Sequence, residues 1–419
     1  MPALGVAQGG FLPNAWVWGG VLPAWAAAVA LVLRDRPGAL RRAWVWLACG
    51  LGLLGWTLAS ALWSVEPAQS ILEARRTVVY VAFALALVVL AQRLPTQTLV
   101  AATHAAISVL IVYSLARYLL EARVPHYPEG YLLSQPLGYS NAVGILAAIG
   151  ALLALERTVG GGSRWTRAAA AASVPLLLLA VELSRSRASW LAFALGVATL
   201  VVLHSAPLVF LRPVTALLPP VAVLLWVGHH SALATAATPR WSGSLVAVVS
   251  LGAAAIAAGA GVLRPPTTLR TRRVPHRWLV IAALCGSAAA AAAWVARSNG
   301  GDPRSAYFRV AWHEYLGHPL LGSGAGTFGR FWVLSGLSAK WGGALDAHSL
   351  YLEILAELGP IGLLLLLGFL LYPVLRLRSS LSVPGVPAAA AATLAFLVHS
   401  GLDWDWEMPA VVTAGLACA

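Results

Sequence analysis

Apolar runs of about 20 residues recur along this chain, and this feature constrains its fold most. A helix needs about 20 consecutive apolar residues to cross the hydrocarbon core of a bilayer. Composition agrees, since 59% of the residues are hydrophobic and 10% are charged, whereas soluble domains carry about 25% charged residues. The runs are continuous rather than alternating, which excludes a transmembrane β-barrel. We expect membrane helices near residues 14–33, 43–63, 77–92, 96–117, 142–156, 168–184, 188–211, 214–232, 244–263, 278–296, 349–375 and 385–401.

The sequence therefore predicts an all-α polytopic integral membrane protein of about 12 transmembrane helices, forming a single domain over residues 1–419. The polar segment 297–348 interrupts the series, and we expect a large loop between two membrane helices there. The first apolar run has no basic stretch before it, so we expect a retained anchor rather than a cleaved signal peptide. Residues 410–419 are apolar but too short to span, so they either dip into the outer leaflet or form the stub of a longer helix.

A net charge of +13 would suggest nucleic-acid binding in a soluble protein, but here the positions of the arginines explain it. They gather in alternate loops, the pattern that marks the cytoplasmic side of a membrane protein. The arginines assigned to that side are Arg34, Arg36, Arg41, Arg42, Arg93, Arg157, Arg164, Arg167, Arg212, Arg264, Arg270, Arg272, Arg273, Arg277, Arg376 and Arg378. Of the 15 carboxylates, only Asp35 and Glu156 clearly share it. We therefore expect a multi-pass protein of the cytoplasmic membrane, with its N-terminus and the 297–348 loop on the extracytoplasmic face.

Two common kinds of site can be set aside. Cys49, Cys285 and Cys418 all lie in apolar segments, so neither a disulfide framework nor a zinc knuckle is expected. The glycines of segment 324–329 match the spacing G-x-G-x-x-G, but no strand precedes them and the segment lies on the face without nucleotides. These glycines more simply indicate tight turns that bring backbone close to a neighbour.

Three arginines on the outer side depart from the positive-inside bias and are therefore candidates for binding a phosphate: Arg185, Arg187 and Arg309. Arginine offers a rigid fork of donors that matches phosphate oxygens. Arg185 and Arg187 would lie about 200° apart on one helix, so both can face one site only if the helix breaks between them. The alternative is a structural role, either contact with lipid headgroups or an ion pair with Glu182.

His348 stands at the predicted start of the membrane helix that follows the long loop. The ordinary pKa of histidine, near 6.5, suits a general base at neutral pH, and a helix N-terminus disfavours the protonated ring. A packing or capping role is the alternative. Glu353 and Glu357 follow on the same helix, and Glu357, about 13 Å further along, is interpreted as a structural residue that needs a partner.

These residues carry a family resemblance that covers most of the chain. The chain resembles the O-antigen ligase and polymerase superfamily. The most specific matching segments are a serine-arginine motif and the series of loop arginine, His-Pro-Leu, histidine and Glu-Leu-Gly motifs. The segments are ALWSVEPAQS at 61–70, PLGYSNAVGILA at 136–147, LSRSRASWLA at 183–192, FRVAWHEYLGHPLLGSGAGTF at 308–328, AHSLYLEILAELGPIGLLL at 347–365 and HSGLDWDWEMPA at 399–410.

The resemblance implies a GT-C-type helical fold and a glycosyltransferase that takes a glycan from an undecaprenyl-diphosphate carrier, without a nucleotide sugar, cofactor or essential metal. It implies that Arg187 and Arg309 bind the diphosphate and that His348 activates the acceptor hydroxyl, with Arg185 as a further basic residue beside the first. The acceptor would be a glycolipid or glycan on the periplasmic face. The long loop near the C-terminal half favours a ligase over a polymerase, while protein glycosylation stays open.

Two alternatives remain at this stage. Asp403 and Asp405 form a D-x-D motif that could hold a metal ion, against an interfacial role beside Trp404 and Trp406. A transporter of lipid-linked glycans would also need many helices and arginines. It should, however, carry ionisable residues at the membrane midplane in repeated halves, whereas here the polar residues collect at one face.

Overall fold

The computed structural model describes residues 2–32, 38–121, 125–126, 129–160, 162–204, 207–237, 239–263, 303–377 and 381–419. Within these ranges the protein is helical, and its only extended pairing is an isolated bridge between His126 and Gly130. The helices of the first half are α1 (Pro2–Val6), η1 (Gln8–Gly10), α2 (Pro13–Val32), α3 (Gly38–Ser60), α4 (Pro67–Leu90), α5 (Thr96–Leu120), α6 (Ser140–Val159) and α7 (Arg164–Ser184). Those of the second half are α8 (Arg187–Leu203), α9 (Pro207–Val214), η2 (Thr215–Leu217), α10 (Leu218–His230), α11 (Gly243–Leu263), α13 (Pro303–Gly317), α14 (Phe328–Leu334), α15 (Ser338–Trp341), α16 (Leu350–Arg376), α17 (Val386–Ser400), η4 (Asp405–Glu407) and α18 (Pro409–Cys418).

Six helices of the described residues are long and apolar enough to cross a membrane, which identifies the chain as a multi-pass membrane protein. They are α3 from Ala43, α5, α6, α7, α11 and α16. Four shorter apolar helices accompany them, over Arg187–Leu203, Thr215–His230, Val386–Ser400 and Pro409–Cys418. The expected helix near 278–296 lies outside the described residues, as does Cys285.

Some predicted boundaries differ from the observed ones. The run 188–211 does not form one helix, because α8 ends at Leu203 and α9 begins at Pro207. The segment expected to be a long loop carries three helices, α13, α14 and α15. The apolar C-terminal residues form α18, which is buried almost throughout and packs against α4, α5, α6 and α17. Burial among protein helices, rather than contact with lipid, explains its apolar composition.

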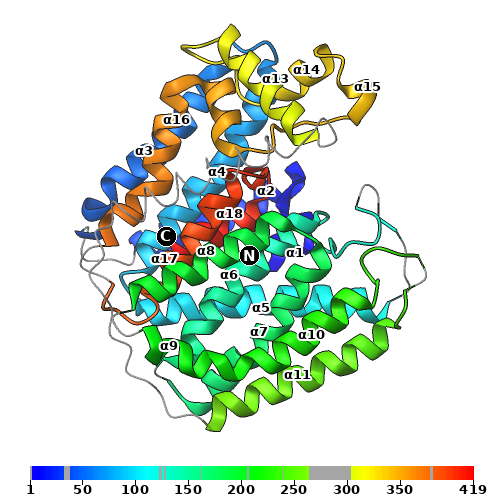
Figure 1. Ribbon diagram of the computed structural model, residues 1–419. Coiled ribbons are helices and arrows are strands. Elements are labelled where there is room, and N and C mark those ends of the chain that lie inside the picture. The colour runs from blue at the N-terminus through cyan, green and yellow to red at the C-terminus, as the bar shows by residue number, and fades with distance from the viewer. Residues whose placement is uncertain are drawn as a thin grey trace.

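α6 forms the centre of the largest group of helices. Its residues are nearly all buried, and it packs against α5, α7, α8 and α17, while α11 packs on the other side of α7. Figure 1 shows α5, α6, α7, α8 and α11 of this group in cyan and green in the lower part of the view, with α13, α14 and α15 in yellow at the top, beside the upper part of α16. α13 and α14 contact α16, which itself packs along α3.

Local sequence explains two breaks in the helical structure, one between α7 and α8 and one within α16. α7 ends where Arg185 adopts a left-handed conformation with φ of 55°, and Ser186 then caps α8 by accepting a hydrogen bond from the Ser189 amide. Serine is a favoured N-cap because its hydroxyl satisfies an amide that the helix leaves unpaired. α16 is interrupted at Gly359, whose φ of 66° is followed by Pro360. Proline cannot donate to the helical ladder, which accounts for a kink at this point.

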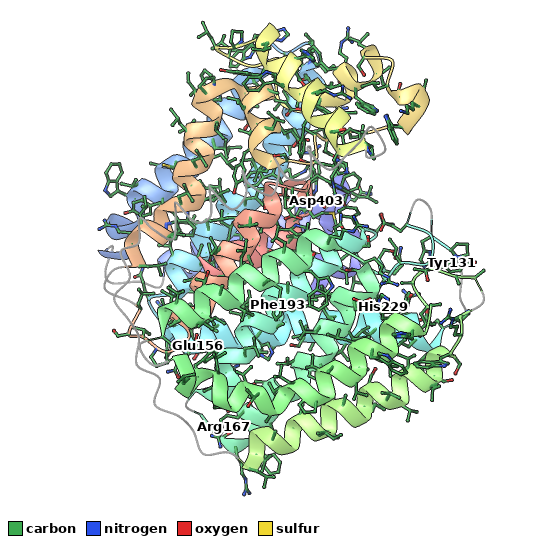
Figure 2. The ribbon with its side chains drawn as sticks, in the orientation of Figure 1. Tyr131, Glu156, Arg167, Phe193, His229 and Asp403 are labelled. Carbon is green, nitrogen blue, oxygen red and sulfur yellow. The ribbon has the colours of Figure 1, made fainter. Side chains whose placement is uncertain are left out.

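Residues assigned from the sequence to opposite faces of the membrane lie in different parts of the molecule. Figure 2 shows Glu156 and Arg167 at the lower left, well separated from Asp403, Tyr131 and His229. Glu156 has a structural role there, because its carboxylate accepts hydrogen bonds from the amides of Gly385 and Ala388 at the start of α17. This contact satisfies amides that an uncapped helix would leave unpaired.

Candidate active site

His348 lies in the segment between α15 and α16, two residues before α16 begins, rather than on the helix itself. Its φ of 53° is in the left-handed region, which is uncommon for a residue other than glycine. The imidazole stacks on the ring of Tyr307 from α13, with centroids 4.6 Å apart, and Trp404 lies 6.3 Å away. The backbone turn and the two aromatic neighbours together fix the direction of the ring.

The hydrogen bond of His348 assigns its tautomer. Nδ1 lies 3.2 Å from the carbonyl oxygen of Asp346. A carbonyl only accepts hydrogen bonds, so Nδ1 carries the hydrogen and Nε2 holds the lone pair of the neutral ring. A histidine oriented through one nitrogen in this way can accept a proton at the other.

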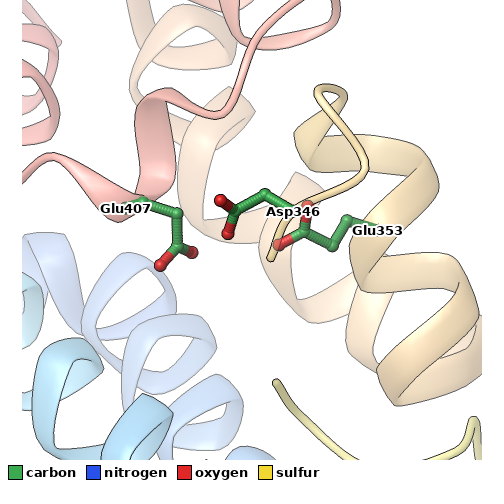
Figure 3. Close-up of side chains that lie close together, drawn as sticks. All are labelled: Asp346, Glu353 and Glu407. Carbon is green, nitrogen blue, oxygen red and sulfur yellow. The ribbon is translucent and has the colours of Figure 1, made fainter. Parts of the chain in front are cut away.

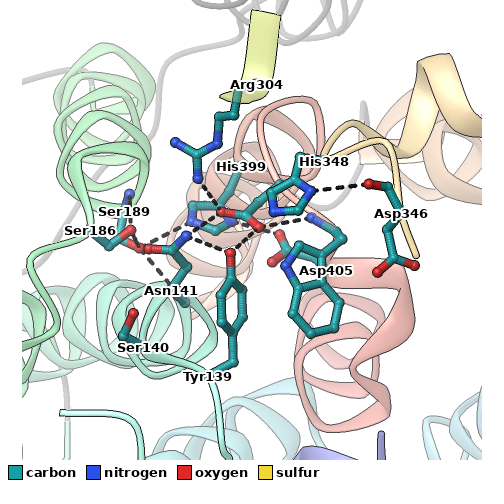
Figure 4. A network of polar contacts seen from close by, with 12 residues as sticks. Tyr139, Ser140, Asn141, Ser186, Ser189, Arg304, Asp346, His348, His399 and Asp405 are labelled. Atoms are coloured by element: carbon teal, nitrogen blue, oxygen red, sulfur yellow. Dashed lines mark hydrogen bonds and ion pairs between the residues drawn. The ribbon is translucent and has the colours of Figure 1, made fainter. Parts of the chain in front are cut away.

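A second aromatic and polar cluster surrounds Asp403, whose side chain is completely buried. Its carboxylate accepts hydrogen bonds from Tyr139 at 2.6 Å, Asn141 at 2.5 Å and the Trp404 amide at 2.9 Å, and Arg304 forms an ion pair with it at 3.0 Å. Figure 4 shows this network beside His348. Burial alone would raise the pKa of the Asp403 carboxyl, but the positive charge of Arg304 and the hydrogen bond from Tyr139 hold that pKa below its usual range.

The neighbouring Asp405 belongs to a different set of contacts. Its Oδ2 lies 2.7 Å from His399 Nδ1, and His399 Nε2 lies 3.1 Å from the hydroxyl of Ser189 on α8. All three side chains are buried. The D-x-D motif therefore does not form one ligand pair, because Asp403 pairs with Arg304 and Asp405 with His399.

The helix between Arg185 and Arg187 is broken, as the hypothesis of a shared site required. Arg185 nevertheless makes the structural contact considered as its alternative. Its Nη1 donates to Glu182 at 2.8 Å and lies 3.0 Å from Nδ1 of His229. Arg187 is the first residue of α8 and is exposed, directly after the Ser186 cap.

On α13, Arg304 rather than Arg309 reaches the Asp403 network beside His348. Arg309 is exposed, and its Nε donates to the Ser305 carbonyl one turn earlier, at 3.3 Å. Arg309 is about 200° around the helix from Tyr307, whereas Arg304 is about 300° away, close to the same face. Arg304 is the one that reaches Asp403. The helical period of buried residues in 303–317 was the signal that could have identified it.

The polar segment before α16 is held by three buried carboxylates. Glu357 accepts hydrogen bonds from the amides of Gly326 and Phe328, which supplies the partner that its position on the helix demands. Glu353 accepts from the Ala347 amide, next to His348. Glu314 accepts hydrogen bonds from the hydroxyls of Ser323 and Thr327.

The glycine-rich turn of this segment has the geometry expected from its sequence. Gly324 and Gly326 have φ of 109° and 75°, and a Cβ at Gly324 would lie 2.6 Å from the Cα of Ser64. The turn interpretation of the G-x-G-x-x-G match is confirmed, because these glycines combine left-handed backbone with close packing.

An acidic cavity of about 510 Å³ lies next to Asp346, whose side chain forms part of its wall. Six carboxylates line it, together with Arg76 and Arg330: Glu66, Glu73, Asp346, Glu353, Glu357 and Glu407. Arg76 is buried and forms ion pairs with Glu73 at 2.8 Å and with Glu407. Burial raises the pKa of the Asp346 carboxyl to about 7, an effect that Arg76 opposes and that Glu73 and Asp403 reinforce.

Three of these residues could hold a cation. One carboxylate oxygen from each of Asp346, Glu353 and Glu407 lies within 4.8 Å of the other two, and within the described parts of the chain this is the one such group of three. Figure 3 shows the three side chains converging from the loop, from α16 and from the segment after α17. Carboxylate oxygens suit Mg²⁺, Ca²⁺ and Mn²⁺. A divalent ion would therefore fit this group better than Asp403 and Asp405, because those two carboxylates face different partners, Arg304 and His399.

The site thus combines a histidine with an accepting nitrogen, an arginine held by a buried carboxylate, and an acidic cavity, all at one end of the helical bundle. No known protein-family model matches this chain, and no curated protein is significantly similar to it.

Proposed function

We propose that this protein is a membrane glycosyltransferase that moves a glycan from an undecaprenyl-diphosphate-linked donor to an acceptor hydroxyl on the extracytoplasmic face. The proposal combines the family resemblance of the sequence with the arrangement of charged groups around His348. It includes a GT-C-like bundle of about 12 transmembrane helices, counting segments outside the described residues. The polar segment 297–348 would be the extracytoplasmic part that covers the site.

The observation that carries the proposal is the orientation of His348. Its Nδ1–H is engaged by the Asp346 carbonyl, which leaves Nε2 as the basic nitrogen, and Tyr307 fixes the ring plane. Asp346, whose carbonyl orients His348, also lines the acidic cavity, where we place the acceptor. The carboxylates of the cavity wall can bind sugar hydroxyls, since carboxylates accept hydrogen bonds.

In the proposed reaction, Nε2 of His348 takes the proton of the acceptor hydroxyl as the oxygen attacks the anomeric carbon. The bond between that carbon and the diphosphate oxygen breaks, and the electron pair leaves with the diphosphate. A single displacement of this kind inverts the anomeric configuration. The Asp403 carboxylate would favour the protonated imidazole that forms, because opposite charges nearby stabilise each other.

Arginines would stabilise the charge that builds on the leaving diphosphate. Arg187 and Arg309 remain the residues implied by the resemblance, with Arg185 as a further candidate. On α13 the geometry favours Arg304 over Arg309, because Arg304 reaches Asp403 beside His348 whereas Arg309 is exposed and bonded to the Ser305 carbonyl. It also weakens the case for Arg185, which is paired with Glu182.

The test is a reconstituted transfer assay with purified protein, an undecaprenyl-diphosphate-linked glycan and candidate glycolipid or glycan acceptors. We expect His348→Ala to abolish transfer while donor binding, measured by displacement of a labelled donor, stays close to that of the original protein. His348→Ala protein that retains transfer would refute the general-base assignment. Loss of donor binding together with loss of folding would indicate the packing role instead.

A polymerase of the same superfamily is the nearest alternative, and the same assay separates the two. A ligase adds a glycan once to an acceptor of different structure, whereas a polymerase extends a second lipid-linked donor and yields a ladder of products. A transporter would move the donor across proteoliposomes without forming a new glycosidic bond. Its test is protection of the labelled donor from an external enzyme in the absence of acceptor.

A further inference from the structure

We propose that Ser189, His399 and Asp405 form a positioning relay that holds the N-terminus of α8, and with it Arg187, at the donor side of the site. The inference rests on the proposed function, because it assigns these residues a role in binding the lipid diphosphate donor. They act through Arg187 and do not touch the reacting atoms.

The relay connects three separate parts of the chain. Asp405 follows α17 and lies 2.7 Å from Nδ1 of His399, which is near the end of α17. With Asp405 ionised, Nδ1 carries a hydrogen that it donates to that carboxylate, and Nε2 lies 3.1 Å from the hydroxyl oxygen of Ser189. Ser189 is in the first turn of α8 and contacts the Ser186 hydroxyl at 2.8 Å. The Ser186 cap and the first turn of α8 are therefore fixed to the end of α17.

The order Ser, His, Asp resembles the catalytic triad of hydrolases, but its burial points to a different role. Ser189 and His399 have 0% exposure and Asp405 has 1%. A nucleophile must be reached by its substrate, and these groups are enclosed by packed helices. A buried and mutually satisfied set of polar groups instead fixes one arrangement of the elements that carry it.

Arg187 is the side chain whose position the relay determines most directly. It is exposed and occupies the first position of α8, one residue after the Ser186 cap and two before Ser189. Close packing on α6 restrains the same turn, because a Cβ at Gly144 would lie 2.6 Å from the Ser189 hydroxyl oxygen and 3.0 Å from Ser186 Cβ. Loss of a hydrogen bond in the relay would let this turn shift, so that the Arg187 guanidinium would no longer be held in one position against the diphosphate.

The relay also runs beside the Asp403 network. Ser189 Oγ lies 3.5 Å from the Asn141 carbonyl, and the Asn141 side chain donates to Asp403. Figure 4 shows Ser186 and Ser189 at the left of the network and His348 at the right, with Asn141, His399 and Arg304 between them. The two aspartates of the D-x-D motif thus fix the two halves of one site, Asp405 the α8 side and Asp403 the α13 side.

The experiment is a double-mutant cycle between His399→Leu and Arg187→Ala in the transfer assay. We expect His399→Leu to raise the donor KM about tenfold, a value typical of a lost buried hydrogen bond, with kcat changed less than about threefold. If His399 acts through Arg187, the double variant should have the same donor KM as Arg187→Ala alone. The acceptor KM should not change in any of these proteins.

Two variants of His399 separate its contact with Ser189 from its contact with Asp405. His399→Gln can place a polar atom near the Nε2 position and keep the Ser189 contact, whereas His399→Asn can keep only the Asp405 contact. Donor KM should stay closer to the original value in His399→Gln. Ser189→Ala removes one hydroxyl and should raise donor KM several-fold even if His399→Leu fails to fold.

The matched control is His104→Leu, since His104 is also buried and its Nε2 lies 2.9 Å from the hydroxyl of Ser173. His104→Leu should lower stability by an amount similar to His399→Leu but leave donor KM unchanged.

Two outcomes would overturn the positioning role. One is an unchanged donor KM in folded Ser189→Ala and His399→Gln proteins, and the other is additive effects of His399→Leu and Arg187→Ala. An inactive original protein would instead count against the proposed function.

Discussion

Replacing Arg304 and Arg309 of α13 with alanine, each in a separate variant, is the sharpest test of the site. The resemblance assigns the diphosphate to Arg309, whereas the structure brings Arg304 to Asp403, next to His348. Both residues lie on one helix and carry the same side chain. Arg304→Ala and Arg309→Ala are therefore a matched pair that differs only in the face of α13 that loses its charge.

The expected size of each effect follows from the contacts. A hydrogen bond to a charged group contributes about 1.5–3 kcal/mol, and about 1.36 kcal/mol corresponds to a tenfold change in rate. Arg304→Ala should therefore reduce kcat/KM for the donor about 10- to 150-fold. Arg309 is exposed and bonded to a carbonyl at 3.3 Å, so its removal should change the rate by about twofold, as for an ordinary surface substitution.

Stability must be measured alongside activity, because Arg304→Ala leaves Asp403 buried. Breaking a buried ion pair costs about 3–5 kcal/mol when no other donor remains. Asp403 keeps hydrogen bonds from Tyr139, Asn141 and the Trp404 amide, so we expect a loss of about 1–3 kcal/mol. Arg304→Lys keeps the charge but not the fork and should recover only part of the activity.

The assay measures initial rates of glycan transfer at varied donor concentration in protein of verified folding. Unfolding by a denaturing detergent, followed by tryptophan fluorescence, gives the stability of each variant. Our reasoning would be refuted if Arg309→Ala lost transfer by 10-fold or more while folded Arg304→Ala retained it. That result would support diphosphate binding by Arg309, as the sequence resemblance implies, and would give Arg304 a structural role.

Three further predictions concern pH, metal ions and the glycine turn. Asp346 has a pKa raised to about 7, above its usual unfolded value near 3.9, so its ionisation in the folded protein is unfavourable and stability should fall as pH rises from about 4 to 7. Asp346→Asn should flatten this dependence and stabilise the protein by about 1 kcal/mol at pH 8, after allowance for solvent screening; an unchanged pH profile of unfolding would contradict it. Transfer should persist in excess EDTA, because arginine supplies the positive charge facing the leaving group. Activity that stops with EDTA and returns with Mg²⁺ or Mn²⁺ would make Asp346, Glu353 and Glu407 the ligands to mutate. Gly324→Ala should destabilise the loop by more than about 2 kcal/mol through its left-handed φ and the contact with Ser64, and a protein of normal stability would show that the turn can adjust.

Several features could be predicted from the sequence because they depend on local pattern. Long apolar runs identified a helical, multi-pass membrane protein, since only regular helices satisfy the backbone in lipid without partners. The glycine turn at 324–326 followed from the conformational freedom of glycine. The helical period showed that Arg185 and Arg187 could share one site only across a break, and the structure has that break. The need of Glu357 for a partner followed from its depth along α16.

Other features were decided by contacts between segments far apart in the chain. The helical period of 303–317 separates Arg304 and Arg309 onto different faces of α13, but only the structure shows that the face of Arg304 meets Asp403. The D-x-D motif looked like one ligand pair, yet Asp403 faces Arg304 and Asp405 faces His399. Neighbouring residues in an irregular segment can point in different directions, and only packing fixes which.

The acidic cavity and the Ser189 relay have the same origin. Asp346, Glu353 and Glu407 come from a loop, a helix and a distant segment, and Ser189 meets His399 across 210 positions of sequence. The sequence by itself determined the helical, multi-pass character of the chain, while the sidedness of the charges and the base at His348 stay predictions. The tertiary structure decided which charges meet, because pairing of buried polar groups depends on distances of about 3 Å that no periodicity in one segment specifies.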